Sequence, residues 1–463
     1  MVWVGSNDGM LHAFKLETGQ EVLALIPPNL LAMQVDLYNN YTANPVKNPV
    51  GQPQMPGSQK YGVAGSPRYA DVYFGSPTND YRTVMLVSQG PGGNLLAGLD
   101  ITSVVTGDTN ASDPKVLWTK TGDTLAGLYK TWSTPAMAAT SSSGTSATWT
   151  CIAGGGFDAS STGSSQKVPR AFTFDPTNGG NTSAKVLGSD TTNSYVGNQA
   201  FSDTVIYSMT ADAYYPDNLA DLALQPDLKG IIWFLPKTGF TPSVGINVSS
   251  KAGQVQPLYY PPAVSGFTAS GTKVDIYAFG SGTFYEKDQD ITGQDVGKTG
   301  YFVPSLFIVT KGQNTTAASI DEILQIKIQD LFRPNADGTP SSYHLGRRSQ
   351  LSAPPALFTP VSGSGSPVAL FLVYDPDSDK CGGTSYIVKI TLDIVGGKPS
   401  AKSTSVYEAG EGAASGFAIA GTAVIVARSG VGEGKKASLG KVPGLNPTQG
   451  LASPTPVWWR ELK

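Results

Sequence analysis

The sequence predicts an all-β protein, a β-propeller of seven blades, with six as the alternative count. Gly and Pro supply 54 and 33 of the 463 residues, while charged residues make up only 14% of the chain. This composition is typical of many short strands joined by tight turns. A unit of strand, Gly-containing turn and strand also recurs along the chain. Such a repeated meander favours a propeller over a two-sheet sandwich, which is the alternative fold.

The first unit, residues 2–27, shows the pattern of the repeat. It reads as a strand, an Asn-Asp-Gly turn at 7–9, a second strand, a turn at Thr18 and Gly19, and a third strand. This order is that of an antiparallel meander. Six further units begin at residues 83, 150, 222, 274, 368 and 416. Within the fifth, residues 323–328 alternate in polarity and predict a strand, although Ser319 and Glu322 have the spacing of a helix-capping box.

We expect residues 1–463 to form one propeller domain that carries a surface insertion at about 28–65. The insertion is rich in Pro and Asn, and we expect one short helix after Asn29. Met1 runs directly into a strand, so we interpret the chain as a fragment of a longer protein that was given a start Met.

Charge and cysteine usage exclude several classes of function. The net charge is −3 and no basic stripe is present, so we expect no nucleic-acid partner. No apolar run approaches the roughly 20 residues of a membrane span. Cys151 and Cys381 form no Cys-x-x-Cys pair, which argues against zinc. They fall in the third and sixth units, so we expect them not to be bonded to each other.

The sequence contains two histidines, His12 and His344. Neither has a recognisable nucleophile and acid near it in the sequence, so we predict no catalytic residue.

Three carboxylates, Asp212, Asp217 and Asp221, crowd a short stretch before the fourth unit that contains no Lys or Arg. Carboxylates this close repel one another unless a cation lies between them, and Ca²⁺ prefers oxygen ligands of this kind. Asp217 and Asp221 keep the spacing of positions 5 and 9 of a calcium loop, whereas Asp212 is one residue too far upstream. We predict calcium ligands from these three side chains and the Leu219 carbonyl; the alternative is a solvated acidic turn.

Two other acidic stretches are weaker candidates for a metal site. Residues 288–295 place oxygens at Asp288, Asp290, Thr292 and Asp295 around a mid-loop Gly. Residues 375–379 contain three alternating carboxylates, but Lys380 follows them directly. A solvated turn between strands explains either stretch equally well.

A series of short motifs, found in a fixed order, resembles the C-terminal propeller of the PilY/PilC family. Members of this family are type IV pilus biogenesis factors and tip adhesins of bacteria. The motifs are VGSNDGMLHAF from Val4, YRTV from Tyr81, AGLDIT from Ala97, WSTP from Trp132, DLKG from Asp227 with Trp233, GSGT from Gly280, CGGTS from Cys381 and WREL from Trp459. The resemblance spans essentially the whole chain.

The resemblance implies a modified propeller of the quinoprotein-dehydrogenase shape without the activity of that enzyme. It implies that an N-terminal region of the full protein is absent here. It aligns the calcium loop of the family with Asp212, Asp217 and Asp221, and in the family this loop controls pilus extension against retraction. It further implies minor pilins and the pilus tip as partners, a host or surface ligand, and a place in the periplasm, on the outer membrane surface or at the pilus tip.

We therefore expect a non-enzymatic module for pilus biogenesis and adhesion, with calcium as its cofactor. One alternative is a quinone-cofactor dehydrogenase on the same fold, which usually needs a vicinal Cys pair that this sequence lacks. The other alternative is a carbohydrate-binding propeller, suggested by Trp and Tyr in the loops.

Overall fold

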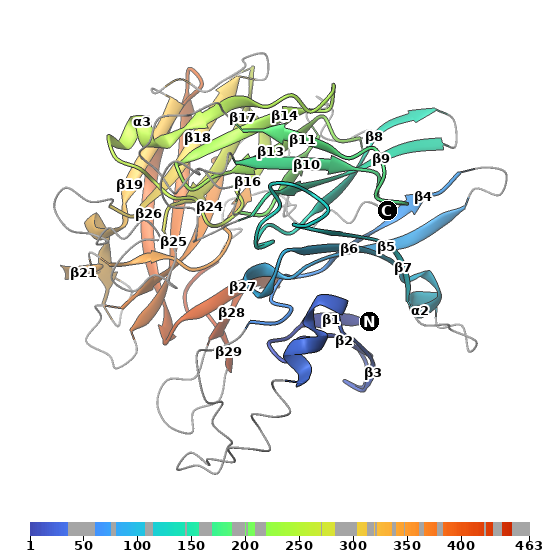
Figure 1. Cartoon of the computed structure of the whole chain (residues 1–463). Helices are drawn as coiled ribbons and strands as arrows, with labels where there is room; N and C mark the ends of the chain where they lie inside the picture. The colour runs from blue at the N-terminus through green and yellow to red at the C-terminus, as the bar shows by residue number, and fades with distance from the viewer. Residues whose placement is uncertain are drawn as a thin grey trace, which may run out of the picture. The chain divides into compact units, whose positions relative to one another are not determined.

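A computed structural model describes most of the chain in two compact units. The described residues are 1–35, 61–75, 80–106, 114–143, 146–156, 169–187, 200, 202–208, 219–269, 271–282, 303–312, 319, 322–335, 339–346, 348–360, 365–376, 383–420, 423–428 and 438–446. Unit 1 comprises residues 1–193 and 199–206, and unit 2 comprises residues 194–198 and 207–463. Figure 1 shows that strands follow one another from the blue N-terminal part to the red C-terminal part.

Unit 1 contains three antiparallel sheets of successive strands. The first has β1 (Val2–Gly5), β2 (Leu11–Phe14) and β3 (Glu21–Leu25). The second has β4 (Arg68–Tyr73), β5 (Tyr81–Ser88), β6 (Leu95–Asp100) and β7 (Lys115–Thr121). The third has β8 (Ala136–Ser143), β9 (Ser146–Gly154), β10 (Arg170–Phe174) and β11 (Ser183–Val186). The short helices η1 (Pro28–Leu30), η2 (Gly90–Gly92) and α2 (Thr102–Thr106) lie between strands.

Unit 2 holds the remaining sheets, and the boundary between the units falls within β12. The fourth sheet has β12 (Val205–Tyr207), β13 (Leu222–Pro226), β14 (Ile231–Pro236) and β15 (Ser243–Asn247), followed by α3 (Val248–Ala252). The fifth has β16 (Ala263–Ala269), β17 (Thr272–Gly280), β18 (Ser305–Gly312) and β19 (Ile323–Lys327), followed by η4 (Ile328–Asp330). The sixth has β22 (Gln350–Leu351), β23 (Ala356–Phe358), β24 (Val368–Asp375), β25 (Thr384–Val395) and β26 (Lys398–Glu411), and the seventh has β27 (Ala414–Ala420), β28 (Ala423–Arg428) and β29 (Ser438–Lys441).

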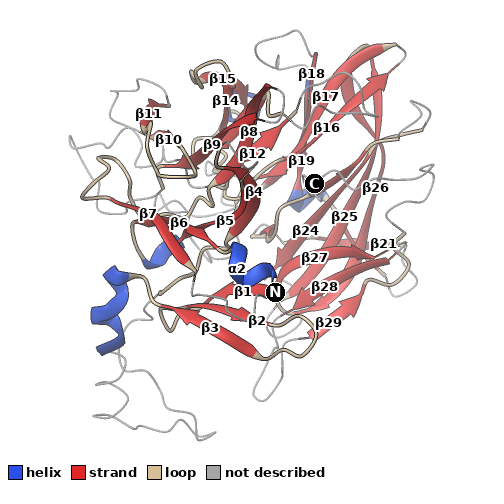
Figure 2. Ribbon diagram, turned by 90° about the vertical axis from the view of Figure 1, so that its right-hand side faces the viewer, coloured by secondary structure: helices blue, strands red, loops and turns tan. Residues whose placement is uncertain are grey.

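An additional two-stranded ribbon of β20 (Phe332–Pro334) and β21 (Pro340–His344) precedes the sixth sheet. Within the described residues, seven sheets of three or more strands therefore correspond to the seven predicted units, and the count of six is wrong. Figure 2 shows that strands make up nearly all of the regular structure. Within the described residues, none of the helices has the length and apolar character needed to cross a membrane.

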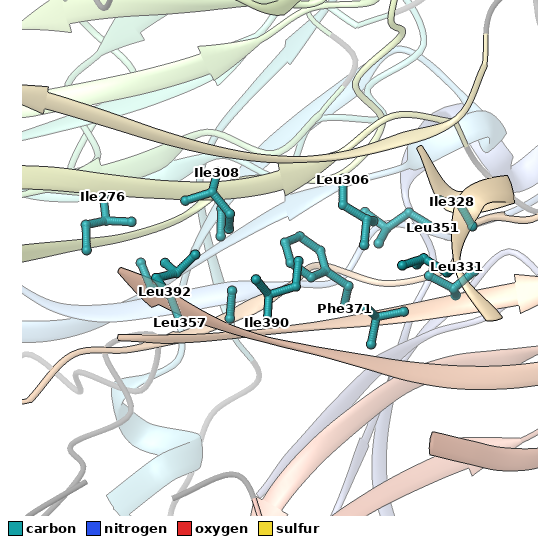
Figure 3. Packing of buried hydrophobic residues seen from close by; sticks show 14 of the residues in the cluster. Ile276, Leu306, Ile308, Ile328, Leu331, Leu351, Leu357, Phe371, Ile390 and Leu392 are labelled. Atoms are coloured by element: carbon teal, nitrogen blue, oxygen red, sulfur yellow. The ribbon is translucent and has the colours of Figure 1, made fainter. Parts of the chain in front are cut away.

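The core of unit 2 lies between the faces of neighbouring sheets. Leu306 and Ile308 of β18 point toward Phe371 of β24 and Ile390 of β25, and all four side chains are fully buried (Figure 3). Alternate residues of each strand reach this core because successive side chains point to opposite faces of a sheet. Burial of large aliphatic and aromatic side chains is the main force that holds such sheets face to face.

The stretch predicted as a surface insertion is not wholly on the surface. Helical residues 31–35 follow η1, as expected after Asn29. Leu30 and Val63, near the two ends of the stretch, are only 5% and 0% exposed and pack in the same core cluster as Leu11 and Met85. These apolar side chains complete the core of the first two sheets; residues 36–60 lie outside the described part, and the surface insertion stays a prediction.

Two local predictions are tested by the strands themselves. The strand expected at 323–328 is confirmed as β19. One half of the capping pattern also forms, because the Ser319 N–H donates to Glu322 Oε2 at 2.6 Å, and β19 begins at the next residue. His344 is the last residue of β21.

Candidate functional site

The predicted calcium ligands fall at the edge of the described structure. Leu219 and Asp221 immediately precede β13, whereas Asp212 and Asp217 lie outside the described residues. Among the weaker candidates, Asp288, Asp290, Thr292 and Asp295 also lie outside the described residues. In the described parts of the chain, no group of three or more His, Cys, Asp or Glu side chains could hold a metal ion.

Asp221, the last residue of the acidic stretch, is joined to the preceding strand by a backbone hydrogen bond. The N–H of Asp221 donates to the carbonyl oxygen of Tyr207, the last residue of β12, at 3.1 Å. β12 and β13 are neighbours in the fourth sheet, so the segment that connects them leaves the sheet and re-enters it in adjacent strands. The Asp221 carboxylate is thus positioned by the sheet.

A basic residue lies beside Asp221, although none is close to it in the sequence. Lys237 Nζ is 2.7 Å from Asp221 Oδ1. The N–H of Lys237 also donates to the carbonyl oxygen of Asp221 at 2.9 Å. Sequence reasoning missed Lys237 because it searched only the acidic stretch. The register supplies the missing signal: Leu222 pairs with Pro236 across the hairpin, so the next pair is Asp221 with Lys237.

The turn of this hairpin is built around the buried carboxylate of Asp227. Its Oδ1 accepts the N–H groups of Lys229 and Ile231 at 2.8 and 3.0 Å, and its Oδ2 accepts the indole N–H of Trp233 at 2.8 Å. Burial raises the pKa of Asp227 to about 6, while the hydrogen bonds from Trp233 and from the backbone act in the opposite direction. Gly230 closes the turn with a φ of 82°, a conformation that favours Gly.

Tyr207, the last residue of β12, connects the fourth sheet to the fifth. Its hydroxyl donates to Asp275 Oδ1 at 2.9 Å. Asp275 stands directly opposite Lys311 in the register of β17 and β18, and both residues are buried. Burial lowers the pKa of Lys311, while the charges of Asp275 and Glu322 raise it. The base of the acidic stretch is therefore fixed to a polar cluster inside the protein.

The third acidic stretch has a structural role at its first residue. Asp375 is fully buried, and its Oδ2 accepts hydrogen bonds from Arg333 Nη2 at 3.0 Å and from the Gly346 N–H at 3.2 Å. Arg333 belongs to the β20–β21 ribbon, so this contact anchors the ribbon to β24. Asp377 and Asp379 lie outside the described residues.

The two histidines contact residues of the strands and turns around them, and Cys151 is buried. His12, in β2, has Nδ1 2.6 Å from Glu21 Oε1 and Nε2 3.0 Å from Asp8 Oδ2. The hydrogen bond with Glu21 is the main cause that raises the pKa of His12. His344 packs its ring against Phe332 at 4.2 Å between centroids. Cys151 is a buried free thiol, and Cys381 lies outside the described residues.

Two of the predicted calcium donors lie within the described residues. Leu219 and Asp221 offer a carbonyl oxygen and a carboxylate beside the closed base of the stretch. Three carboxylates and a carbonyl are the oxygen donors that Ca²⁺ takes in proteins. A cation at the Asp221 carboxylate would have to displace the Lys237 ammonium or share this oxygen with it.

Comparison with known proteins identifies the family. A family model described as the PilY1 beta-propeller domain matches residues 1–237. A type IV pilus biogenesis factor PilY1 homolog of Xylella fastidiosa (strain Temecula1) is 32% identical over 160 residues, which are 34% of this chain and 10% of that protein. The type IV pilus biogenesis factor PilY1 of Pseudomonas aeruginosa (strain UCBPP-PA14) is 28% identical over 270 residues, which are 57% of this chain and 20% of that protein.

One solved structure supports this fold. The crystal structure of the C-terminal domain of Pseudomonas aeruginosa PilY1 matches with a TM-score of 0.54 at 18% identity, covering 95% of this chain and 92% of that chain. A quinohemoprotein alcohol dehydrogenase of Comamonas testosteroni gives a TM-score of 0.43 at 10% identity, covering 92% of this chain and 62% of that chain. Nothing about the chemistry of that enzyme carries over at this level of similarity.

The matched segments make up only 10% and 20% of the two curated relatives, so the activity of a whole relative is not a property of this chain by itself. Both relatives are named as pilus biogenesis factors and not as enzymes. The family model nevertheless covers half of the chain, and the order of motifs noted above runs along the rest. The chain is a seven-bladed β-propeller and belongs to the PilY1 beta-propeller family of type IV pilus biogenesis factors.

Proposed function

We propose that this chain is a non-enzymatic module for type IV pilus biogenesis and adhesion, and that calcium regulates it. The observation that carries the proposal is the match of residues 1–237 to the PilY1 propeller family. The surroundings of His12, Cys151 and Asp227 support the non-enzymatic part, because their contacts belong to strands and turns. A quinone-cofactor dehydrogenase would instead reduce dye when supplied with the cofactor, and a carbohydrate-binding propeller would give signals on a glycan array.

In this proposal, calcium is bound by the carboxylates of Asp212, Asp217 and Asp221 together with the Leu219 carbonyl. Support comes from the described end of the stretch, where the sheet fixes the Asp221 backbone next to Tyr207. A bound Ca²⁺ would neutralise the repulsion among the carboxylates. The chain's contribution is to hold Asp221 in place by the β13–β14 hairpin.

The partners that fit this function are minor pilins at the pilus tip and a ligand on a host cell or another surface. The location that fits is the periplasm, the outer membrane surface or the pilus tip of a bacterium. Support for these assignments comes from the names of the relatives alone, which link the family to the type IV pilus.

The test is a substitution in the full-length protein in a bacterium that lacks its own copy. Asp217→Ala should change the number of surface pili or the twitching zone while the protein remains abundant. Asp123→Ala, at an exposed residue outside the acidic stretches, is the matched control and should leave both unchanged. Pili and twitching that are unaltered by Asp217→Ala would reject calcium regulation, and normal pili after deletion of residues 1–463 would reject the role in biogenesis.

A further inference from the structure

The outer strand of the sixth sheet has a long edge to which no described strand is paired. β26 pairs with β25, and the order of the sheet places β26 at its end. β25 and β26 are the longest strands of the described chain, with 12 and 14 residues (Figure 2). β19, β20 and β28 also approach β26, but none of them joins its ladder within the described residues. An edge strand of this kind presents N–H and C=O groups that can pair with a further strand.

The middle of β26 is accessible on both faces of the sheet. Every residue from 400 to 405 is exposed, whereas most residues of β25 are buried. In a strand that covers a core, only every second residue would be exposed, because successive side chains point to opposite faces. The edge is also regular here, since the register with β25 runs without a shift from Ser403 to Glu408. A regular run of about six residues is the usual length of a strand in globular proteins.

The charges of β26 are divided between its two halves. Lys398 and Lys402 lie in the first half, and Glu408 and Glu411 lie in the second half. An identical strand that runs antiparallel along the edge would bring its glutamates beside the lysines of the first copy. A parallel copy would place like charges side by side, which is destabilising. The edge is therefore complementary in charge to an antiparallel copy of itself.

Symmetry restricts the register of such a pair. Opposite residues of antiparallel strands alternate between hydrogen-bonded and non-hydrogen-bonded pairs, so a two-fold axis can pass only between a residue and its own copy. When that residue is Ser405, Lys402 lies directly opposite Glu408 of the second copy. A centre one residue away in either direction loses this match. Thr404 then faces Val406, and both residue types favour strands.

We propose that β26 is a dimerisation edge, at which a second copy of this chain adds its own β26 in antiparallel register centred on Ser405. The backbone groups of the two edges supply the hydrogen bonds, and the two symmetric pairs of Lys402 with Glu408 select the register. Within one copy, Lys402 Nζ donates to the Ser366 hydroxyl at 3.4 Å, a weaker partner than a carboxylate. Because one strand edge is a small contact, the dimer should be weak, and its population should rise with protein concentration.

Sedimentation velocity of the whole chain over a wide range of concentration tests the inference. Lys402→Glu and Glu408→Lys each turn both symmetric pairs from attraction into repulsion, so each variant alone should dimerise roughly tenfold more weakly than the parent, or more weakly still. An equimolar mixture of the two variants restores opposite charges at both pairs and should dimerise like the parent. Lys115→Glu, at an exposed position of β7 in the second sheet, is the matched control and should dimerise like the parent.

Circular dichroism of each variant shows whether the sheets are retained, so that loss of folding is not mistaken for loss of the dimer. If a charge reversal disturbs the spectrum, Lys402→Gln and Glu408→Gln take its place. Each of them removes one charge from both symmetric pairs without adding repulsion, and each should weaken the dimer roughly fivefold.

Each outcome supports or overturns the inference. A dimer that is weakened in both reversed variants and recovered in their mixture supports it. A parent protein that stays monomeric at every soluble concentration overturns it. A dimer that the variants leave unchanged also overturns it, because another surface then holds the two copies together. The same conclusion follows from a dimer that the folded variants lose and their mixture does not recover, since Lys402 and Glu408 are then not opposite each other.

Discussion

At the turn of the β13–β14 hairpin, the Asp227 carboxylate is fully buried and its pKa is about 6, above its ordinary value of 3.8. Ionisation of Asp227 therefore opposes folding. The free energy of unfolding should be highest where the group is protonated, fall as the pH rises from about 4 to about 6, and be constant above that range. The N–H groups of Lys229, Ile231 and Trp233 limit this loss because they stabilise the ionised form.

Trp233→Phe should reveal that stabilisation through its dependence on pH. The substitution removes the indole donor and leaves the Asp227 carboxylate with one partner fewer, at a cost of about 1–3 kcal/mol when the carboxylate is ionised. The loss should be larger at pH 8 than at pH 4.5, as measured by urea denaturation at both values. The control is Trp118→Phe, because the Trp118 indole donates to the neutral carbonyl of Pro176. An equal loss at the two pH values for Trp233→Phe would contradict this account of the turn.

Among single residues, the sequence could predict Asp221 as part of the candidate site but not its partner. Lys237 is invisible to a search along the acidic stretch, because the contact depends on the antiparallel register of β13 and β14. That register could have been extended from the turn at Asp227 and Gly230. Asp275, on β17, could not have been linked to Tyr207 in this way, because the contact joins two sheets.

At the scale of elements, the β20–β21 ribbon is attached to the sixth sheet by a buried ion pair. Arg333 and Asp375 are 17% and 0% exposed. Removal of one partner from a buried pair leaves an uncompensated charge and costs about 3–5 kcal/mol. Arg333→Met should therefore lower the free energy of unfolding by about this amount, as measured by guanidinium denaturation of the protein.

Two further variants sharpen that measurement. Arg333→Met combined with Asp375→Asn should recover part of the loss, since no charge then remains buried. Lys327→Met, at an exposed position at the end of β19, should change stability by less than about 0.5 kcal/mol. A loss of the same size in the double variant as in Arg333→Met would show that the charge of Asp375 is not the cause.

The strands that the sequence predicted are those with large apolar side chains, such as β5, β14, β18 and β24. Strands β8, AMAATSSS, and β16, AVSGFTA, were missed because small residues give little contrast between the two faces. Strand β26, KPSAKSTSVYEAGE, is polar along most of its length because most of its residues are exposed. Pattern reasoning depends on a contrast between a buried apolar face and an exposed polar face, so it fails for strands in which that contrast is weak.

At the scale of the whole molecule, the blade count and the family were both predictable from the sequence. The count follows from the repeated hairpins, each of which forms around Gly-containing turns such as those at Gly9 and Gly230. The family follows from the order of many short motifs along the chain. The calcium site stays a prediction, because the spacing from Asp212 to Asp221 departs from that of a regular calcium loop and two of its carboxylates lie outside the described residues.

The thiols provide a probe of the folded molecule. Burial raises the pKa of Cys151 well above the ordinary value, so its thiol should be unreactive in the native protein. Denatured, unreduced protein should show two free thiols with a chromogenic thiol reagent, since Cys151 and Cys381 are predicted not to be bonded. Detection of no free thiol in a denatured monomer would contradict this prediction.

Calcium-dependent thermal stability of the purified chain tests the central claim most directly. An ion that binds only the folded state stabilises it by about 2.7 kcal/mol at a hundredfold excess over the Kd. The parent protein should therefore melt up to several degrees higher in excess calcium than in chelator. Asp217→Ala should lose that rise and keep the β-sheet spectrum of the parent. An unchanged melting temperature of the parent at millimolar calcium, or an undiminished rise in Asp217→Ala, would contradict the account.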